Sequence, residues 1–156
     1  MAPTGSPTAT RRPTGDAALA ARLRLGATRL ARILRREADT GLSPSQLSAL
    51  ATVEIHGPMT LGALADHENV APPSITKVVN ILDAQGLVSR QAGATDRRVA
   101  MVTITAEGNR LLDESRRRKN QWLAARISKL DADQKARLAD ALDVIEVLTT
   151  TGDQTP

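Results

Sequence analysis

The sequence predicts a mainly α-helical fold that carries one small β-hairpin wing. Two observations lead to this fold class. Apolar residues recur with the 3.6-residue spacing of amphipathic helices along most of the 156 residues. The spacing changes to the two-residue alternation of strands only once, between residues 87 and 105. A chain of this length accommodates one domain's worth of core, so the predicted elements belong to a single architecture.

The N-terminal part is expected to be a tail followed by a long helix. Residues 1–16 are rich in proline, threonine and glycine and predict a disordered tail. Residues 17–39 predict a helix within an N-terminal dimerisation segment at 17–42, because leucines keep one apolar stripe while six arginines lie elsewhere. That stripe needs a cover, which suggests a partner helix, from this chain or from another.

Two shorter helices with clear start signals follow. Ser43 is placed as an N-cap, with Pro44 as the first helical residue and Gln46 completing a capping box. The residues expected on the inner side of this helix are Leu47, Leu50, Ala51 and Ile55. The run His56-Gly57-Pro58 ends it, and Thr60 is placed to cap a helix from Leu61 to His67.

The next helix has two different faces. Its predicted buried stripe consists of Ile75, Val78, Val79 and Leu82. The opposite side is small, polar and cationic, and it is formed by Pro73, Lys77, Asn80 and Ala84, with Ser74 and Thr76 beside them. Such side chains let a helix enter a DNA major groove about 12 Å wide and reach base edges and phosphates. Gly86 is placed to end the helix in a left-handed conformation.

A β-hairpin is predicted directly after this helix. Its strands are residues 87–91 and 99–105, and the run AGATDRR between them supplies the turn. The tip carries Asp96, Arg97 and Arg98. An arginine there can enter a DNA minor groove while the carboxylate holds it, although these residues taken alone are more typical of a solvated turn with a surface ion pair. Their position after the polar helix favours DNA, and residues 43–104 are predicted to form a winged helix-turn-helix DNA-binding region.

The remaining chain, residues 105–149, is expected to complete a dimerisation region. Thr105 is placed to cap a helix from Ala106 to about Leu130, and Asp131 with Gln134 begins another helix through a second capping box. One continuous apolar face of that last helix consists of Leu138, Ala141, Leu142, Ile145 and Leu148. A two-fold interface with a second chain would bury this face, and an intrachain bundle is the less favoured alternative. Residues 150–156 predict a flexible tail.

Composition and charge narrow the functional classes. The net charge is +4 and the isoelectric point about 10.3, which suits an anionic partner such as nucleic acid. Residues 11–36 carry +7 and residues 37–71 carry −5, so basic and acidic segments are separated. The absence of cysteine excludes thiol chemistry and fits a reducing cytoplasm. No run has the length of a membrane span and the start lacks the apolar core of a signal peptide, so a cytoplasmic protein without a membrane partner is expected.

Neither catalysis nor a bound cofactor is predicted. The sequence contains no nucleophile elbow, no glycine-rich phosphate loop and no metal signature. His56 and His67 lack the neighbouring ligand set that a metal site needs, and solvated or capping histidines are the better interpretation. Trp122 is expected to be a packing anchor. Residues 116–119, RRRK, are expected to be a solvated face, with a place near the DNA backbone or the attraction of an anionic effector as alternatives.

In their order and spacing, these motifs resemble the winged helix-turn-helix of the MarR family of bacterial transcription regulators. The resemblance is carried by the capped helix at Pro44, the run MTLGALA, the run PSITKVVNILDAQGLV, the DRR of the hairpin tip and the helix start TAEG. It extends through the flanking helices and covers nearly all of residues 17–149.

The resemblance implies a homodimer that binds a roughly palindromic operator in double-stranded DNA. By position, the residues that resemble the major-groove contacts of a recognition helix are Ser74, Thr76, Lys77 and Asn80. Asp96, Arg97 and Arg98 match the wing, where either arginine is a candidate for the minor groove. Pro73 and Arg90, which lie on the same helix and on the following strand, complete the predicted DNA-binding set.

The resemblance also implies a transcriptional regulator. We expect a repressor, because an occupied operator can block polymerase, and activation is the alternative because the sign of regulation depends on operator position. Many family members release DNA when a small anionic or aromatic effector binds, and here the sequence singles out no pocket residues for one. The alternative is an architectural or protein-interaction winged-helix module without operator specificity, held to DNA by phosphate contacts alone.

Overall fold

The computed structural model describes residues 15–92 and 100–150, and the chain divides into two compact units, residues 1–36 and 37–156. Most of α1 (Asp16–Ala38) lies in the first unit. The elements of the second unit are α2 (Pro44–His56), β1 (Met59–Thr60), α3 (Leu61–His67), α4 (Pro72–Ala84), β2 (Val88–Ala92), β3 (Ala100–Ile104), α5 (Ala106–Ile127) and α6 (Ala132–Thr150). The predicted tails fall almost wholly outside the described residues.

The helices of the second unit begin where local capping signals place them. Ser43 Oγ accepts the Gln46 N–H at 3.3 Å, and Gln46 Oε1 accepts the Ser43 N–H at 2.8 Å. Asp131 and Gln134 form the same reciprocal pair before α6, at 2.7 and 3.2 Å. Thr60 Oγ1 accepts the backbone N–H three residues along, at 3.1 Å, and so caps α3. These three predicted caps are therefore confirmed, and each satisfies N–H groups that a helix start leaves without partners.

The end of α4 is a left-handed glycine cap, as predicted. Gly86 has a φ of 71°, a conformation that costs a residue without a Cβ little. The Gly86 N–H donates to the Asp83 carbonyl and the Leu87 N–H donates to the Leu82 carbonyl, both at 2.9 Å. These two bonds define a Schellman motif, and they turn the chain directly into β2.

The predicted hairpin is part of a three-stranded antiparallel sheet with the order β1-β3-β2. Val88 pairs with Ile104 and Ala92 with Ala100, so β2 and β3 pair along their full length. The third strand, β1, was not predicted; Met59 pairs with Val102 at the inner edge of β3. Away from the hairpin tip, β2 begins one residue later than predicted and β3 ends one residue earlier, because pairing rather than residue type decides where a strand starts and stops.

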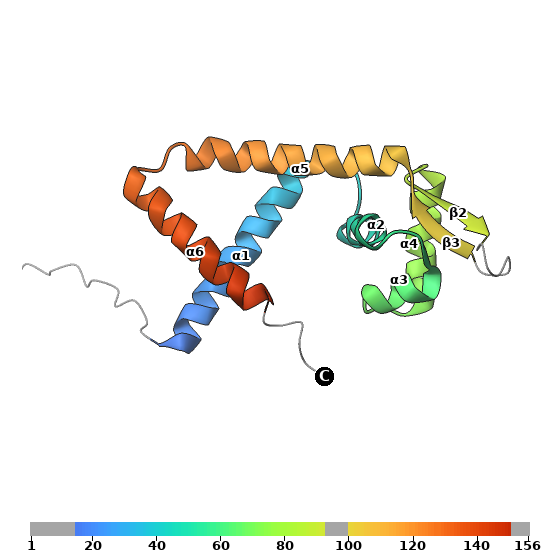
Figure 1. Cartoon of the computed structure of the whole chain (residues 1–156), viewed down its shortest axis with the longest axis horizontal. Helices are drawn as coiled ribbons and strands as arrows, with labels where there is room; N and C mark the ends of the chain where they lie inside the picture. Colours follow the sequence, from blue (N-terminus) through green and yellow to red (C-terminus); the bar gives the residue numbers. More distant parts are fainter. Residues whose placement is uncertain (1–14, 93–99, 151–156) are drawn as a thin grey trace, which may run out of the picture. The chain divides into compact units, whose positions relative to one another are not determined.

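The core of the second unit lies between α2, α3, α4 and the sheet, which are grouped at the N-terminal end of α5 (Figure 1). The largest fully buried apolar side chains are Leu50, Val53, Leu64, Ile75, Val79, Leu82, Val88 and Val102. The expectation that Ile55 faces inward is wrong: this side chain is 69% exposed, and Ala49 and Val53 occupy the buried side of α2 instead. Ile55 follows Val53 by two residues, which is about 200° around a helix, so it points away from the core that Val53 faces.

The start of α5 is locked against the end of α4. Thr105 Oγ1 accepts the Gly108 N–H at 3.0 Å as an N-cap and donates its own proton to the Gly86 carbonyl at 2.7 Å. The Thr105 N–H donates to the Leu87 carbonyl at 3.1 Å. One residue thus caps α5 and joins it to the turn that follows α4. This helix ends at Ile127, one turn before the predicted end.

The last helix, α6, buries none of its residues within the chain, and all of them are described. Leu142 and Leu148 on its predicted apolar face are 51% and 58% exposed. Trp122, in α5, is half-buried, and the Arg126 guanidinium lies 3.4 Å above its ring. No helix in the described part of the chain is both long and apolar enough to cross a membrane.

Candidate nucleic-acid interface

The two faces of α4 differ as the sequence predicts. Ile75, Val79 and Leu82 are at most 2% exposed and anchor the helix to the core. The opposite side consists of exposed Pro73, Ser74, Lys77, Asn80 and Ala84. Because the buried stripe fixes the rotation of the helix about its axis, the polar side chains are held outward on a rigid element.

Thr76 lies at the border between these faces and is half-buried. Its hydroxyl donates to the Pro72 carbonyl, one turn earlier, at 2.9 Å. The hydroxyl proton is therefore used within the helix, and the oxygen keeps only acceptor capacity toward a ligand. Pro72 and Pro73 occupy the first turn, where missing N–H groups break no intrahelical bond.

Arg90, on β2, reaches across to the outward side of α4. Its Nη2 donates a hydrogen bond to Asn80 Oδ1. Its Nε lies 3.7 Å from Asp83 Oδ2, the only acidic side chain of α4, all of which is described. The guanidinium thus offsets an acidic charge that would otherwise oppose the phosphates of DNA. Two residues of the predicted DNA-binding set, Asn80 and Arg90, are brought together by this contact.

The predicted wing tip, with Asp96, Arg97 and Arg98, lies outside the described residues. The strands that lead to it are described as far as Ala92 and from Ala100 onward. The role of the wing in DNA binding stays a prediction.

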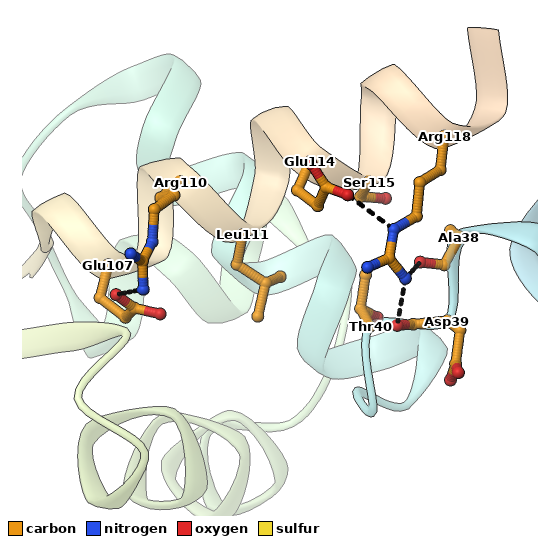
Figure 2. A pocket seen from close by; sticks show the side chains of 9 residues that line it. All are labelled: Ala38, Asp39, Thr40, Glu107, Arg110, Leu111, Glu114, Ser115 and Arg118. Carbon is orange, nitrogen blue, oxygen red and sulfur yellow. Dashed lines mark hydrogen bonds and ion pairs between the residues drawn. The ribbon is translucent and has the colours of Figure 1, made fainter. Parts of the chain in front are cut away.

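A cavity of about 320 Å³ lies between the start of α5 and the segment that follows α1 (Figure 2). Arg118 closes one side: its Nε donates to Glu114 at 2.8 Å and its Nη1 to the carbonyls of Ala38 and Asp39 at 3.3 and 3.4 Å. Ser115 is 2% exposed, and its hydroxyl has no hydrogen-bond partner among the described residues. The cavity itself was not predicted. Only the ion pairs in its lining could have been, because the sequence places glutamate and arginine three or four residues apart on one helix.

Arginine lowers the pKa of two carboxylates in and beside this cavity, Glu114 and Glu54. The pKa of Glu114 lies below its ordinary value because Arg117 and Arg118 both donate hydrogen bonds to it. On the neighbouring face of α5, the hydrogen bonds from Arg116 lower the pKa of Glu54 of α2 in the same way. Arg116 and Arg118 are exposed, as predicted for residues 116–119, and they also bond Glu54 of α2 and the carbonyl of Ala38 at the end of α1.

The two histidines stack on each other at the ends of α2 and α3, with ring centroids 4.4 Å apart. Both are exposed. No group of three or more potential metal ligands occurs among residues 15–92 and 100–150.

Known proteins with a similar sequence and fold show the family to which this chain belongs. The family model of the MarR family matches residues 42–100. An uncharacterised HTH-type transcriptional regulator of Mycobacterium leprae is 42% identical over 131 residues, which cover 83% of this chain and 92% of that protein. A candidate transcriptional regulator of Pseudomonas aeruginosa, known from its crystal structure, is 34% identical with a TM-score of 0.77 over 88% of this chain and 98% of its own. The chain belongs to the MarR family.

As a MarR family member, the protein is a DNA-binding transcriptional regulator of the helix-turn-helix type and not an enzyme. A mutant of MepR from S. aureus, solved bound to an oligodeoxyribonucleotide, has the same fold, with a TM-score of 0.68 at 15% identity over 83% of this chain and 97% of its own. The predicted family and fold class are confirmed. The MarR match encloses α4, Arg90 and the wing, so every predicted DNA-binding residue lies inside it.

Proposed function

We propose that this MarR-type regulator binds, as a homodimer, an operator built from two similar half-sites, and that it acts as a repressor in the cytoplasm. The observation that carries the proposal is the outward side of α4, where exposed Ser74, Lys77 and Asn80 project from a helix whose other side is fixed in the core. Such a face fits the major groove and offers donors and acceptors to base edges.

The apolar residues left exposed on the terminal helices support the homodimer. Leu142, Ile145 and Leu148 of α6 are between 36% and 58% exposed, and Leu19 and Leu23 of α1 are 62% and 40% exposed. Exposed apolar side chains of this kind, recurring along a helix, mark a contact with another chain. A two-fold dimer gives each copy the same contact and sets two recognition helices on one face of the duplex.

The decisive experiment measures binding to the DNA upstream of the protein's own gene and its neighbours, with random duplex as competitor and salt varied. We expect competitor-resistant binding with a two-fold footprint whose halves lie about one helical turn, 10 bp, apart. Binding that random duplex removes equally well favours the architectural alternative, in which phosphate contacts alone hold the protein.

Base reading is tested by Lys77→Ala and Asn80→Ala. Each should reduce the discrimination between operator and random DNA by about 1–3 kcal/mol. Lys129→Ala is the matched control, because Lys129 is an exposed lysine beyond the end of α5 and outside the residues that match the family model. Equal losses on both DNAs would make Lys77 and Asn80 phosphate contacts instead.

The wing is tested by the double variant Arg97→Ala with Arg98→Ala. Loss of minor-groove and phosphate contacts should weaken affinity and flatten the dependence of the binding constant on salt. An unchanged salt slope would remove the wing from the interface.

The dimer is tested by sedimentation of the full chain. The wild type should sediment as a dimer, and Ile145→Glu combined with Leu148→Glu should give monomers, because a charged side chain inside an apolar interface is strongly unfavourable. A monomeric wild type at micromolar concentration would leave the intrachain bundle as the better interpretation.

For an effector, the cavity beside Ser115 is the proposed site. Three carboxylates and two guanidinium groups line it, and Arg110 and Arg118 each bond a glutamate, so its lining favours a neutral polar molecule over an anion. Benzamide and benzoate, tested for release of the protein from its operator, separate these two chemistries. Ser115→Ala should abolish the response to benzamide, and an unaffected response would place the effector elsewhere.

A further inference from the structure

Arg90 holds the Asn80 side chain in one orientation. Asn80 is exposed on the outward side of α4, whereas the Arg90 side chain is 29% exposed and its Nε is buried. The Arg90 Nη2 donates to Asn80 Oδ1, and the Nε lies 3.7 Å from the Asp83 carboxylate one turn along the same helix. The guanidinium therefore has contacts with two residues of α4 at once and is confined between them.

This contact decides which end of the Asn80 amide faces outward. A guanidinium group carries only donors, so the group that faces Arg90 must be the carbonyl oxygen of the amide. The Nδ2 group, with its two protons, then points away from Arg90. A free asparagine rotates broadly about its last torsion and exposes either end. Asn80 instead presents a hydrogen-bond donor from the middle of the polar face.

We propose that Arg90 is a positioning residue that makes Asn80 a fixed donor and thereby selects guanine over adenine at the base pair that Asn80 contacts. The inference rests on the proposed base reading by α4. An asparagine that reads adenine accepts from N6 through Oδ1 while it donates to N7. With Oδ1 engaged by Arg90, that pairing is lost. Guanine offers two acceptors, N7 and O6, and both match the outward Nδ2 group.

Asp83 strengthens this arrangement. Its carboxylate draws the guanidinium toward α4 from the other side, 3.7 Å from Nε, so Arg90 cannot swing out to a phosphate without leaving an acidic charge uncompensated. The hydrogen bond from Arg90 Nη2 to Asn80 Oδ1 is charge-assisted and gives geometric specificity as well as energy, while the ion pair with Asp83 adds attraction toward α4. The three side chains form one unit, in which Arg90 acts on DNA through Asn80.

The experiment selects binding sites for the full chain from a pool of randomised DNA duplexes and compares the wild type with Arg90→Met, which keeps the unbranched apolar stem of the side chain but has no donor. The wild type should enrich a motif with guanine at the position whose preference disappears in Asn80→Ala. Replacing that G·C pair by A·T should weaken wild-type binding about tenfold, within the range for one well-placed base contact.

In Arg90→Met the preference for guanine over adenine at that position should fall to about equal, while the preferences at the other positions stay unchanged. The double variant Arg90→Met with Asn80→Ala should lose no more discrimination at that position than Asn80→Ala alone, because both changes act on one contact. Arg90→Lys, which keeps the charge but presents a single point donor, should restore the preference only in part.

A second variant does not depend on removing Arg90. Asn80→Asp keeps a partner for the guanidinium but points an acceptor outward, so the preferred base should change from guanine to cytosine, whose N4 is a donor. Circular dichroism of both variants confirms that the winged region is folded.

Three results overturn the inference. A preference for guanine that survives in Arg90→Met shows that Asn80 needs no positioning. Equal weakening on the motif and on random duplex, with a smaller salt slope, makes Arg90 a phosphate contact. An Asn80→Asp protein that still selects guanine removes Asn80 from base reading. A selection that enriches no motif with any of these proteins refutes the proposed sequence-specific function itself, and the positioning role with it.

Discussion

Replacing Gly108 by alanine tests how the DNA-binding elements are joined to α5. A Cβ at this position would lie 2.2 Å from the Leu87 carbonyl oxygen and 2.7 Å from Ile104 Cγ1. The carbonyl is backbone and cannot rotate out of the way. It also accepts the Thr105 N–H at 3.1 Å, so moving it away breaks a bond between the end of α4 and the start of α5.

The expected loss of stability follows from three contributions. Forcing a methyl group into a filled site costs about 1–3 kcal/mol. Displacing the first turn of α5 weakens the Thr105 cap, which contributes about 1 kcal/mol. Alanine in place of glycine stabilises a helix by about 1 kcal/mol and offsets the loss of the cap. Gly108→Ala should therefore lower the free energy of unfolding by about 1–3 kcal/mol.

Urea unfolding followed by circular dichroism, at one fixed protomer concentration, measures this change. Gly62→Ala is the matched control, because it makes the same substitution at an exposed position of α3, where the nearest atom, Thr60 Oγ1, is 3.8 Å from the new Cβ. The control should be as stable as the wild type or slightly more so. If Gly108→Ala unfolds at the same urea concentration as Gly62→Ala, the inference that the Leu87 carbonyl leaves no room for a side chain at position 108 is wrong.

Three further predictions concern stability. The hydrogen bonds from Arg116 hold the pKa of Glu54 below its ordinary value of 4.5, so the stabilisation is complete above about pH 4.5 and is lost as the pH falls through the lowered pKa. Glu54→Gln should cost less than about 1 kcal/mol at pH 7, since Arg116 is half exposed, and less than that at pH 2. A loss of equal size in urea titrations at both pH values would contradict the ion pair. Asn69 has a φ of 51°, so Asn69→Ala should lower stability by about 1 kcal/mol while Asn69→Gly does not, and equal melting temperatures would disprove the strain. Thr60→Ala should cost about 1 kcal/mol through the lost cap of α3, and native-state hydrogen exchange should show the loss in that helix first.

The helix ends could be predicted from the sequence because their partners are close along the chain. Ser43 and Gln46 bond each other three residues apart, as do Asp131 and Gln134. The Schellman turn at Gly86 likewise joins residues no more than five apart. Such bonds form whenever the local residue types permit the geometry, so tertiary packing only has to tolerate them.

The two faces of α4 were predictable for a related reason. A helix with one apolar stripe buries that stripe, and the polar side then faces outward whatever the neighbouring elements are. Ile75, Val79 and Leu82 lie in the core, and Lys77 and Asn80 lie outside it. The candidate major-groove residues were therefore identified from periodicity, and the family resemblance added their role.

Tertiary structure alone decided the contacts between residues that belong to different helices and strands. Two residues, Met59 and Thr60, form β1 only because β3 offers them an edge, and no local pattern distinguishes them from a turn. The need for glycine at position 108 arises from the approach of the Leu87 carbonyl, which depends on how α5 meets the sheet. Periodicity identified Asn80 as an outward polar side chain, but its orientation is set by Arg90 from the neighbouring strand. Sequence thus determined which surfaces face outward, since that depends on hydrophobicity and local spacing, whereas packing determined how the side chains on them are held, since that depends on distances between elements.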